Sequence, residues 1–173
     1  MIKVKLSEQA KKLKETLDID FLPKLATDGS NGYDLKACVE SKIMIPPGEE
    51  YKIPTGVHVW LGDEFPYSGF GNSVNWEILS FVRLCGLYLP RSSNKGLTLV
   101  NTVGLLDSDY QGESFLKYRN TTNHAIYISP GERIGQLVIV PSITVPLQLV
   151  ESFDKETTRG EGGFGSTNDP LGR

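Results

Sequence analysis

The stretch GLLDSDYQGE, residues 104–113, runs from a short apolar segment into acidic residues and a glycine. This order predicts a β-strand followed by a tight turn, the pattern of a β-hairpin. Asp107 comes directly after the apolar segment, so we expect its carboxylate at the edge of the core, where it can act as a general base towards water. An acidic hairpin tip without chemistry explains the same residues, and this stretch alone does not decide between the two.

Outside this hairpin, short apolar segments alternate with turn residues such as PPGE at 46–49 and SPGE at 129–132. The segments that we predict as strands are 2–6, 32–37, 42–45, 50–53, 57–61, 84–89, 97–103, 114–118, 125–128, 134–140 and 147–153. Short strands in this number predict an all-β barrel or jelly roll. Residues 7–17 form the one predicted helix, which begins at Ser7 and carries Leu13 and Leu17 on a narrow stripe, and we expect it to be a solvated surface helix.

Composition limits the classes of function. The chain has 173 residues, enough for one domain, and a net charge of −3, which disfavours non-specific nucleic-acid binding. The two cysteines, Cys38 and Cys85, have no disulfide-framework spacing, which favours a reduced cytoplasmic location. We find no apolar run long enough to span a membrane and no signal-peptide pattern in the first 17 residues.

Three further segments carry groups that suit phosphates or a base, although each also has an unremarkable explanation. LPRSSNKGL (89–97) joins cations to hydroxyls, which suit phosphate, but is also an ordinary polar loop. Gln136 interrupts an apolar strand and needs hydrogen-bond partners, usually for structural reasons. TRGEGGFGSTN (158–168) has glycines that let the backbone approach phosphate and one aromatic, Phe164, that can stack on a base, but it also suits a flexible tail.

In order along the chain, five segments resemble the five motifs of the trimeric dUTP diphosphatases (dUTPases). They are NGYDLKA (31–37), PRSS (90–93), NTVGLLDSDYQGE (101–113), GERIGQLVIVP (131–141) and RGEGGFGST (159–167). The resemblance implies an all-β, distorted jelly-roll (β-clip) subunit with one short N-terminal helix, assembled as a homotrimer whose active sites are shared between subunits. It implies a β domain over 1–157, with a long loop insertion at about 62–81, and a flexible lid motif over 158–173.

The resemblance also implies a reaction: dUTP and water give dUMP and diphosphate, which limits uracil incorporation into DNA and supplies dUMP for dTMP synthesis. Asp107 matches the aspartate that activates the water attacking the α-phosphorus. The implied cofactor is Mg²⁺, held mainly by the triphosphate with no direct protein ligand, and with Asp34 nearby through water. The implied partners are dUTP and two further copies of the chain, in the cytoplasm, or in the host cytoplasm if the source is viral.

The remaining expected roles are all in substrate binding. Tyr110 matches the aromatic residue under the deoxyribose, which leaves no room for a 2′-hydroxyl. The positions matching phosphate binders are Arg91, Ser92, Ser93 and Gln136, those matching uracil binders are Asn101, Gly104, Leu105 and Leu106, and those matching the lid are Arg159, Gly162, Phe164, Ser166 and Thr167.

Two departures from the family pattern keep alternatives open. The loop that contains Lys95 is shorter than usual, and segment 62–81 is longer, as in phage members of the family. One alternative is a dCTP deaminase-like enzyme, which shares the R-S-S of residues 91–93. Its catalytic glutamate, however, precedes an asparagine by three residues, and here Lys117 holds that place before Asn120. The other alternative is a regulatory binding protein of dUTPase fold that uses segment 62–81.

Overall fold

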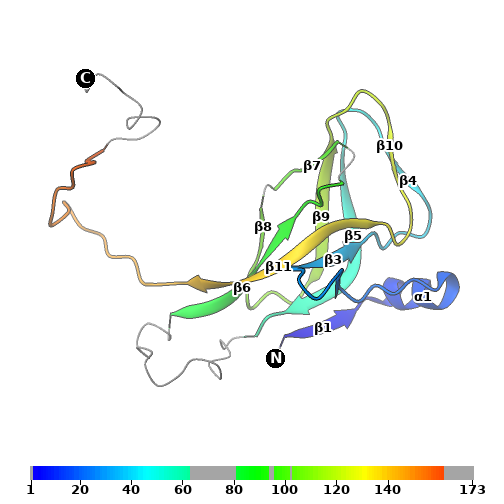
Figure 1. Ribbon diagram of the computed structural model, residues 1–173, viewed down its shortest axis with the longest axis horizontal. Helices are drawn as coiled ribbons and strands as arrows, with labels where there is room; N and C mark the ends of the chain where they lie inside the picture. The colour runs from blue at the N-terminus through cyan, green and yellow to red at the C-terminus, as the bar shows by residue number, and fades with distance from the viewer. Residues whose placement is uncertain (1, 63–80, 94–95, 102, 162–173) are drawn as a thin grey trace.

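The computed structural model describes residues 2–62, 81–93, 96–101 and 103–161. These residues form a β-rich body with one helix (Figure 1). The elements are β1 (Lys3–Leu6), α1 (Glu8–Leu17), β2 (Lys24–Leu25), β3 (Gly32–Lys36), β4 (Ile43–Ile45), β5 (Glu50–Trp60), β6 (Val82–Leu89), β7 (Leu97–Leu99), β8 (Gly104–Leu106), β9 (Glu113–Asn120), β10 (Ile126–Ile128) and β11 (Arg133–Ile143). The all-β fold with a short N-terminal helix is therefore confirmed.

The strands make two larger antiparallel sheets and one pair. One sheet has the order β1-β5-β9-β7, the other has the order β2-β3-β11-β6-β8, and β10 pairs with β4. Two hydrogen bonds made by tyrosine hydroxyls join the two larger sheets. The Tyr118 hydroxyl on β9 donates to the Ile134 carbonyl of β11 at 2.6 Å, and the hydroxyls of Tyr88 (β6) and Ser114 (β9) lie 2.6 Å apart. The core thus lies between the sheets, with polar contacts that fix their relative position.

Strand β9 shows how the two-residue period of a strand divides its side chains between core and surface. Ser114, Leu116, Tyr118 and Asn120 are buried, whereas the side chains between them are exposed or half-buried. The second set consists of Glu113, Phe115, Lys117 and Arg119. One face of β9 therefore belongs to the core, and the opposite face is available to a functional site.

Helix α1 begins as the sequence predicts, because the Ser7 hydroxyl accepts a hydrogen bond from the Ala10 amide at 3.2 Å. Helix α1 lies on the surface as expected, with every residue except Ala10 and Leu13 exposed. Ala10 is 0% exposed and Leu13 is 3% exposed, so the helix packs on the sheet. Gly56 makes this possible, since a Cβ there would lie 2.7 Å from both the Ala10 Cβ and the Cys38 sulfur.

Three strand predictions need correction. Segments 50–53 and 57–61 are one strand, β5, whose pairing with β9 shifts register where Gly56 adopts a φ of 73°. In segment 97–103 only residues 97–99 form a strand, β7, which pairs with β9. Segment 147–153 is not a strand. It belongs to an extended arm that leaves the body after β11 (Figure 1), with Leu147 97% exposed.

Candidate functional site

A cleft of about 610 Å³ opens beside β8 and β9. Five residues expected in the site line it: Asn101, Leu105, Leu106, Asp107 and Tyr110. They come from β8, from the turn after it and from the segment before it. The structure therefore brings the expected base-binding, sugar-binding and catalytic residues together in one place.

The turn after β8 places Asp107 and Tyr110 by local interactions. The Tyr110 amide donates to the Asp107 carbonyl at 3.2 Å, which closes the turn, and the Tyr110 hydroxyl donates to the Glu113 carbonyl at 3.1 Å. Gly112 leaves room for Tyr110, because a Cβ at this position would displace the Tyr110 hydroxyl and ring edge from the place they occupy. Asp107 follows the buried Leu106, and its own side chain is exposed to the cleft.

A second glycine makes room for Asn101. A Cβ on Gly104 would lie 2.7 Å from the Asn101 amide nitrogen and 3.3 Å from the Tyr88 ring. Between them, Val103 has a φ of 58°, which is strained for a β-branched residue. The side-chain amide of Asn101 therefore packs against Gly104 at the start of β8, and the strained backbone of Val103 lies between the two residues.

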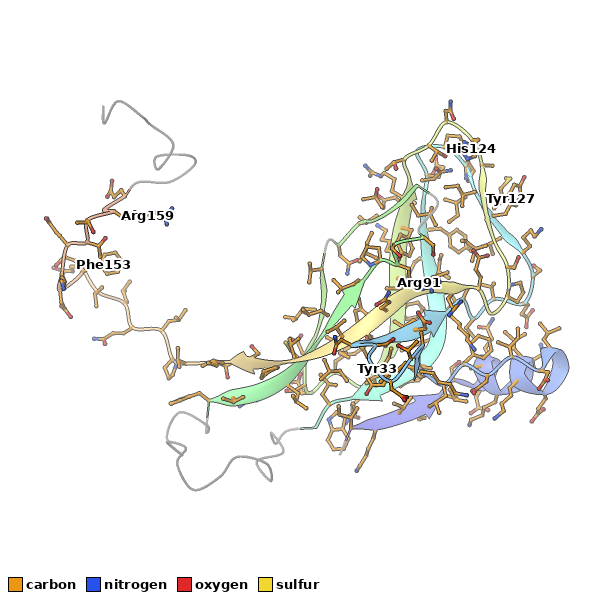
Figure 2. All side chains as sticks on the ribbon, in the orientation of Figure 1. Tyr33, Arg91, His124, Tyr127, Phe153 and Arg159 are labelled. Carbon is orange, nitrogen blue, oxygen red and sulfur yellow. The ribbon has the colours of Figure 1, made fainter. Side chains whose placement is uncertain are left out.

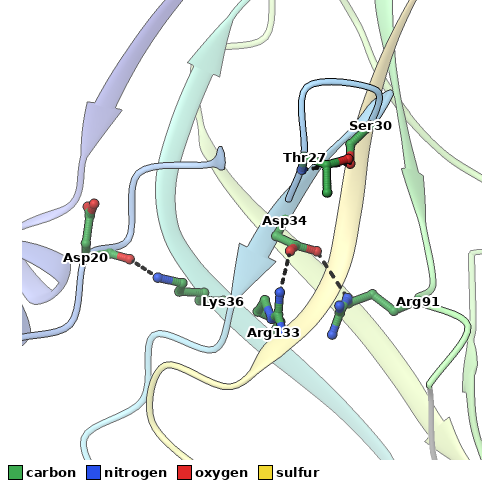
Figure 3. A network of polar contacts seen from close by, with 7 residues as sticks. All are labelled: Asp20, Thr27, Ser30, Asp34, Lys36, Arg91 and Arg133. Carbon is green, nitrogen blue, oxygen red and sulfur yellow. Dashed lines mark hydrogen bonds and ion pairs between the residues drawn. The ribbon is translucent and has the colours of Figure 1, made fainter. Parts of the chain in front are cut away.

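A separate polar centre surrounds Asp34 (Figure 3). Its side chain is 11% exposed, and Oδ1 lies 3.1 Å from Arg91 Nε while Oδ2 accepts a hydrogen bond from Arg133 Nη1 at 3.2 Å. The Arg91 Nε has no aligned hydrogen-bond partner, so its contact with Asp34 is an ion pair by distance. Asp34 thus holds one arginine on each carboxylate oxygen.

Arg133 is the residue of this centre that the sequence prediction missed. It lies in GERIGQ (131–136), three residues before Gln136, and was therefore inside a recognised segment. The antiparallel pairing of β3 with β11 places Gln136 opposite Asp34 and leaves Arg133 within reach of the same carboxylate. A cation close to a motif glutamine was the signal available in the sequence.

The other expected phosphate binders lie near this centre. Arg91 and Ser93 line a small pocket that also contains Arg133. Ser92 and Ser93 are exposed in a turn, and Gln136 is half-buried, with its side chain packed against Gly32 so closely that a Cβ there would collide with it. The groups form a cationic, hydroxyl-bearing surface suited to an anion.

Within this chain, the residues around Asp34 and the β8–β9 cleft are not part of the same pocket. The arm carries Arg159 away from the body (Figure 2), so within this chain the arginine lies apart from both centres. The expected residues Gly162, Phe164, Ser166 and Thr167 lie outside the described residues, as does Lys95. The residues expected in one active site therefore lie in two separate places in this chain, and those of the lid are not all described.

Burial and hydrogen bonds shift the pKa values of two side chains near the cleft, Tyr88 and Glu50. Burial raises the pKa of Tyr88, an effect that its hydrogen bond with Ser114 partly offsets. Hydrogen bonds from Lys117 and then Arg119 lower the pKa of Glu50, which keeps this carboxylate charged beside the cleft. The wall formed by β9 and β5 therefore carries fixed charge at neutral pH.

Within the described ranges, no group of three or more His, Cys, Asp or Glu side chains is placed to hold a metal ion. Asp34, the acidic residue expected near the metal, has both oxygens engaged by arginines. These residues suit the positioning of Arg91 better than direct metal ligation. The one described helix is too short and too polar to cross a membrane.

Comparison with known proteins assigns the family. A family model described as dUTPase matches residues 74–168. The deoxyuridine 5′-triphosphate nucleotidohydrolase of Hahella chejuensis is 44% identical over 149 residues, which cover 84% of this chain and 86% of the relative. The protein of the same name from Ectopseudomonas mendocina is 42% identical over 161 residues, which cover 91% of this chain and 94% of the relative.

Solved structures show the same fold. The dUTPase of Staphylococcus bacteriophage 80alpha with dUPNHPP has a TM-score of 0.71 and 25% identity, and the match covers 96% of this chain and 97% of that chain. A dUTPase variant from phage phi11 of S. aureus, described with a structural Mg(II) ion, has a TM-score of 0.65 and 21% identity over 90% of this chain and 99% of its own. Because the family model spans more than half of the chain and the sequence relatives cover most of it, this chain belongs to the dUTPase family.

Proposed function

We propose that this protein hydrolyses dUTP to dUMP and diphosphate. The observation that carries the proposal is the β8–β9 cleft, where Asn101, Asp107 and Tyr110 meet in the arrangement that the resemblance assigns to uracil, the attacking water and deoxyribose. The names of the relatives, deoxyuridine 5′-triphosphate nucleotidohydrolase, support the same reaction. Binding of a dUTP analogue by the phage 80alpha enzyme supports the same substrate class.

In the proposed reaction, the Asp107 carboxylate takes a proton from water while the water oxygen bonds to the α-phosphorus. The bond between this phosphorus and the bridging oxygen to the β-phosphate breaks, and diphosphate leaves with the electron pair. Asp107 suits this role because its side chain is exposed to the cleft while the turn fixes its backbone. Asn101 recognises the base through its amide, and the Tyr110 ring excludes a 2′-hydroxyl on steric grounds.

The phosphates would be bound by the cationic surface around Asp34. Arg91, held by Asp34, offers its terminal guanidinium nitrogens to phosphate oxygens, and Ser92, Ser93 and Gln136 provide further donors. This surface and the cleft are separate in one protomer, which supports a homotrimer in which one copy supplies the cleft and another the phosphate surface. The arm would carry the lid segment 158–173 to a further copy.

Mg²⁺ would accompany the triphosphate, where it neutralises charge on the phosphates. The described residues do not form a direct site for it, so its ligands would be phosphate oxygens and water. In the cell, the reaction would limit uracil incorporation into DNA and supply dUMP for dTMP synthesis. We propose a cytoplasmic location because this is where the nucleotide pool lies.

The experiment is incubation of the protein with dUTP, dCTP, dTTP and UTP in the presence of Mg²⁺, with release of diphosphate and monophosphate as the readout. Diphosphate and dUMP are expected from dUTP alone. Release of ammonia from dCTP would instead identify a deaminase. No turnover of any of the four nucleotides would refute catalysis and favour a binding role for the fold.

A further inference from the structure

Strand β5 is irregular where it passes the turn that follows β8. Pro54 of β5 lies opposite Phe115 of β9, and the next paired residue of β5, His58, lies opposite Glu113. The pairing therefore leaves residues 55–57 of β5 opposite a single residue of β9, which makes this part of β5 a bulge. Bulges often lie next to active sites, where they change the direction of a side chain. Here the first side chain after the bulge is that of His58.

Two hydrogen bonds hold the start of β9 against the bulge. The Thr55 hydroxyl donates to the Ser114 carbonyl at 2.7 Å in the buried interior. The Gly56 amide donates to the Glu113 carboxylate at 2.8 Å. These contacts satisfy polar groups where the bulge interrupts the regular pairing of β5 with β9, so they fix the place where β9 begins.

His58 extends this contact from β9 to the turn itself. Its Nδ1 lies 3.0 Å from the backbone carbonyl oxygen of Gln111, the residue that follows Tyr110. A carbonyl oxygen only accepts hydrogen bonds, so the ring must donate through an Nδ1–H group. His58 is half-buried and Gln111 is exposed, so loss of the bond leaves the Gln111 carbonyl open to water and costs the fold little.

The turn has two further hydrogen bonds, which join residues 107–113 to one another. The Tyr110 amide donates to the Asp107 carbonyl, and the Tyr110 hydroxyl donates to the Glu113 carbonyl. These two bonds shape the turn but do not fix it relative to β5, whereas the bond from His58 does. We propose that His58 is a positioning residue, which holds the turn so that the Asp107 carboxylate and the Tyr110 ring keep their orientation in the cleft. This inference rests on the proposed hydrolysis of dUTP.

The surroundings of the His58 ring bear on whether its protonation matters. Lys5 of β1 and Glu113 of β9 lie opposite His58 in the two strand pairings. Lys3 lines the same pocket of about 210 Å³, with its ammonium 4.8 Å from the centre of the Trp60 ring. Both the neutral Nδ1–H form and the charged form of histidine donate through Nδ1. The positioning role is therefore expected to persist between about pH 5 and 8, where histidine ordinarily changes charge.

The test compares kcat and KM for dUTP in His58→Leu, His58→Asn and His124→Leu variants, well below their melting temperatures. Leucine removes the donor, so kcat should fall roughly threefold to thirtyfold with KM within about twofold, because Asp107 acts in the transition state. The asparagine amide nitrogen takes the place of Nδ1, so His58→Asn should keep kcat within about threefold of the original. His124 lies in the loop after β9, at the other end of this strand (Figure 2), so His124→Leu is the matched control and should leave kcat unchanged.

The tautomer of the imidazole gives a readout that does not depend on turnover. Heteronuclear NMR of the neutral ring should place the His58 proton on Nδ1, because the hydrogen bond to Gln111 selects this tautomer. The chain has two histidines, so the spectrum of His124→Leu assigns the signals of His58.

Several outcomes would overturn the inference. A proton on Nε2 of neutral His58 would show that the ring does not donate to Gln111. Unchanged kcat in His58→Leu, in a protein that hydrolyses dUTP, would remove the positioning role while the proposed function stands. A loss of kcat that His58→Asn does not restore, or that varies between about pH 5 and 8, would assign the ring to proton transfer instead. If the original protein leaves dUTP intact, the proposed function fails and the inference fails with it.

Discussion

Asp34 and Arg91 form an ion pair between β3 and the loop after β6, with 3.1 Å between Oδ1 and Nε. The pair joins residues 57 positions apart in the sequence, and the Arg91 side chain is 23% exposed. The Asp34 carboxylate contacts Arg91 through Nε, and we expect the two terminal nitrogens of Arg91 to donate to an anion. The pair therefore positions Arg91 for an anion rather than neutralising it completely.

Replacing Asp34 with Asn is expected to reduce kcat/KM for dUTP by about tenfold to a hundredfold, because one charge-assisted contact to each arginine is lost. Steady-state kinetics measure this change. Asp20→Asn is the control, since Asp20 pairs with Lys24 at 2.6 Å on the surface and should leave activity unchanged. Equal activity in Asp34→Asn would show that Arg91 needs no carboxylate to reach the phosphates.

Asp107→Asn should lower kcat by about 10²–10⁴-fold, the range for loss of a general base. The melting temperature should stay the same, because the side chain is exposed and only its backbone carbonyl closes the turn. Single-turnover kinetics and a thermal melt measure the two quantities. Asp109→Asn, in the same turn, is the matched control, and an equal loss of kcat in both variants would argue against a specific base.

Tyr110→Ala should relax the discrimination between dUTP and UTP, because it removes the ring that excludes a 2′-hydroxyl. The ratio of kcat/KM values for the two substrates measures the effect. Tyr110→Phe keeps the ring and loses only the hydrogen bond to the Glu113 carbonyl, so this variant should retain the discrimination. A relaxed ratio in both variants would assign the effect to the turn geometry and not to the ring.

Tyr118→Phe should cost about 1–3 kcal/mol of unfolding free energy at neutral pH, because the buried Ile134 carbonyl loses its donor. Burial raises the pKa of Tyr118 to about 12 from a usual value of 10.0. The stability contributed by the neutral phenol is therefore present below pH 10 and lost as the pH rises through about 12.

Denaturant unfolding at several pH values tests this linkage. The original protein should lose stability more steeply than Tyr118→Phe between pH 10 and 12. The pKa of Cys38 is also raised, to about 11, mainly by burial, and this effect is common to both proteins. Parallel pH profiles would show that Tyr118 is accessible to water in the folded protein.

Deletion of residues 158–173 should lower kcat strongly and leave the melting temperature nearly unchanged, because residues 158–161 are exposed and lie on an arm that leaves the body. Mixing the truncated chain with an Asp107→Asn chain gives a sharper test. If the lid acts on another copy, mixed assemblies should recover part of the activity. No recovery in assemblies shown to be mixed would place the lid on its own subunit.

Local chemistry in the sequence predicts much of this protein. Ser7 marks the start of α1, and the order of Asp107, Tyr110 and Gly112 specifies a turn whose hydrogen bonds join residues only three positions apart. Such contacts depend on a few neighbouring residues, so their residue types are sufficient to predict them. The five motif segments indicated the dUTPase family, and the comparisons with known proteins confirm this assignment.

Tertiary structure decided the features that depend on register between distant strands. Arg133 reaches Asp34 across 99 positions of sequence, and Lys117 faces Lys52 and enters the cleft because β9 pairs with β5. No local pattern encodes these neighbours, since a shift of one residue in either register would turn the side chain to the opposite face. The sequence by itself therefore determined the hairpin that carries the chemistry, whereas strand pairing decided which charged groups surround it.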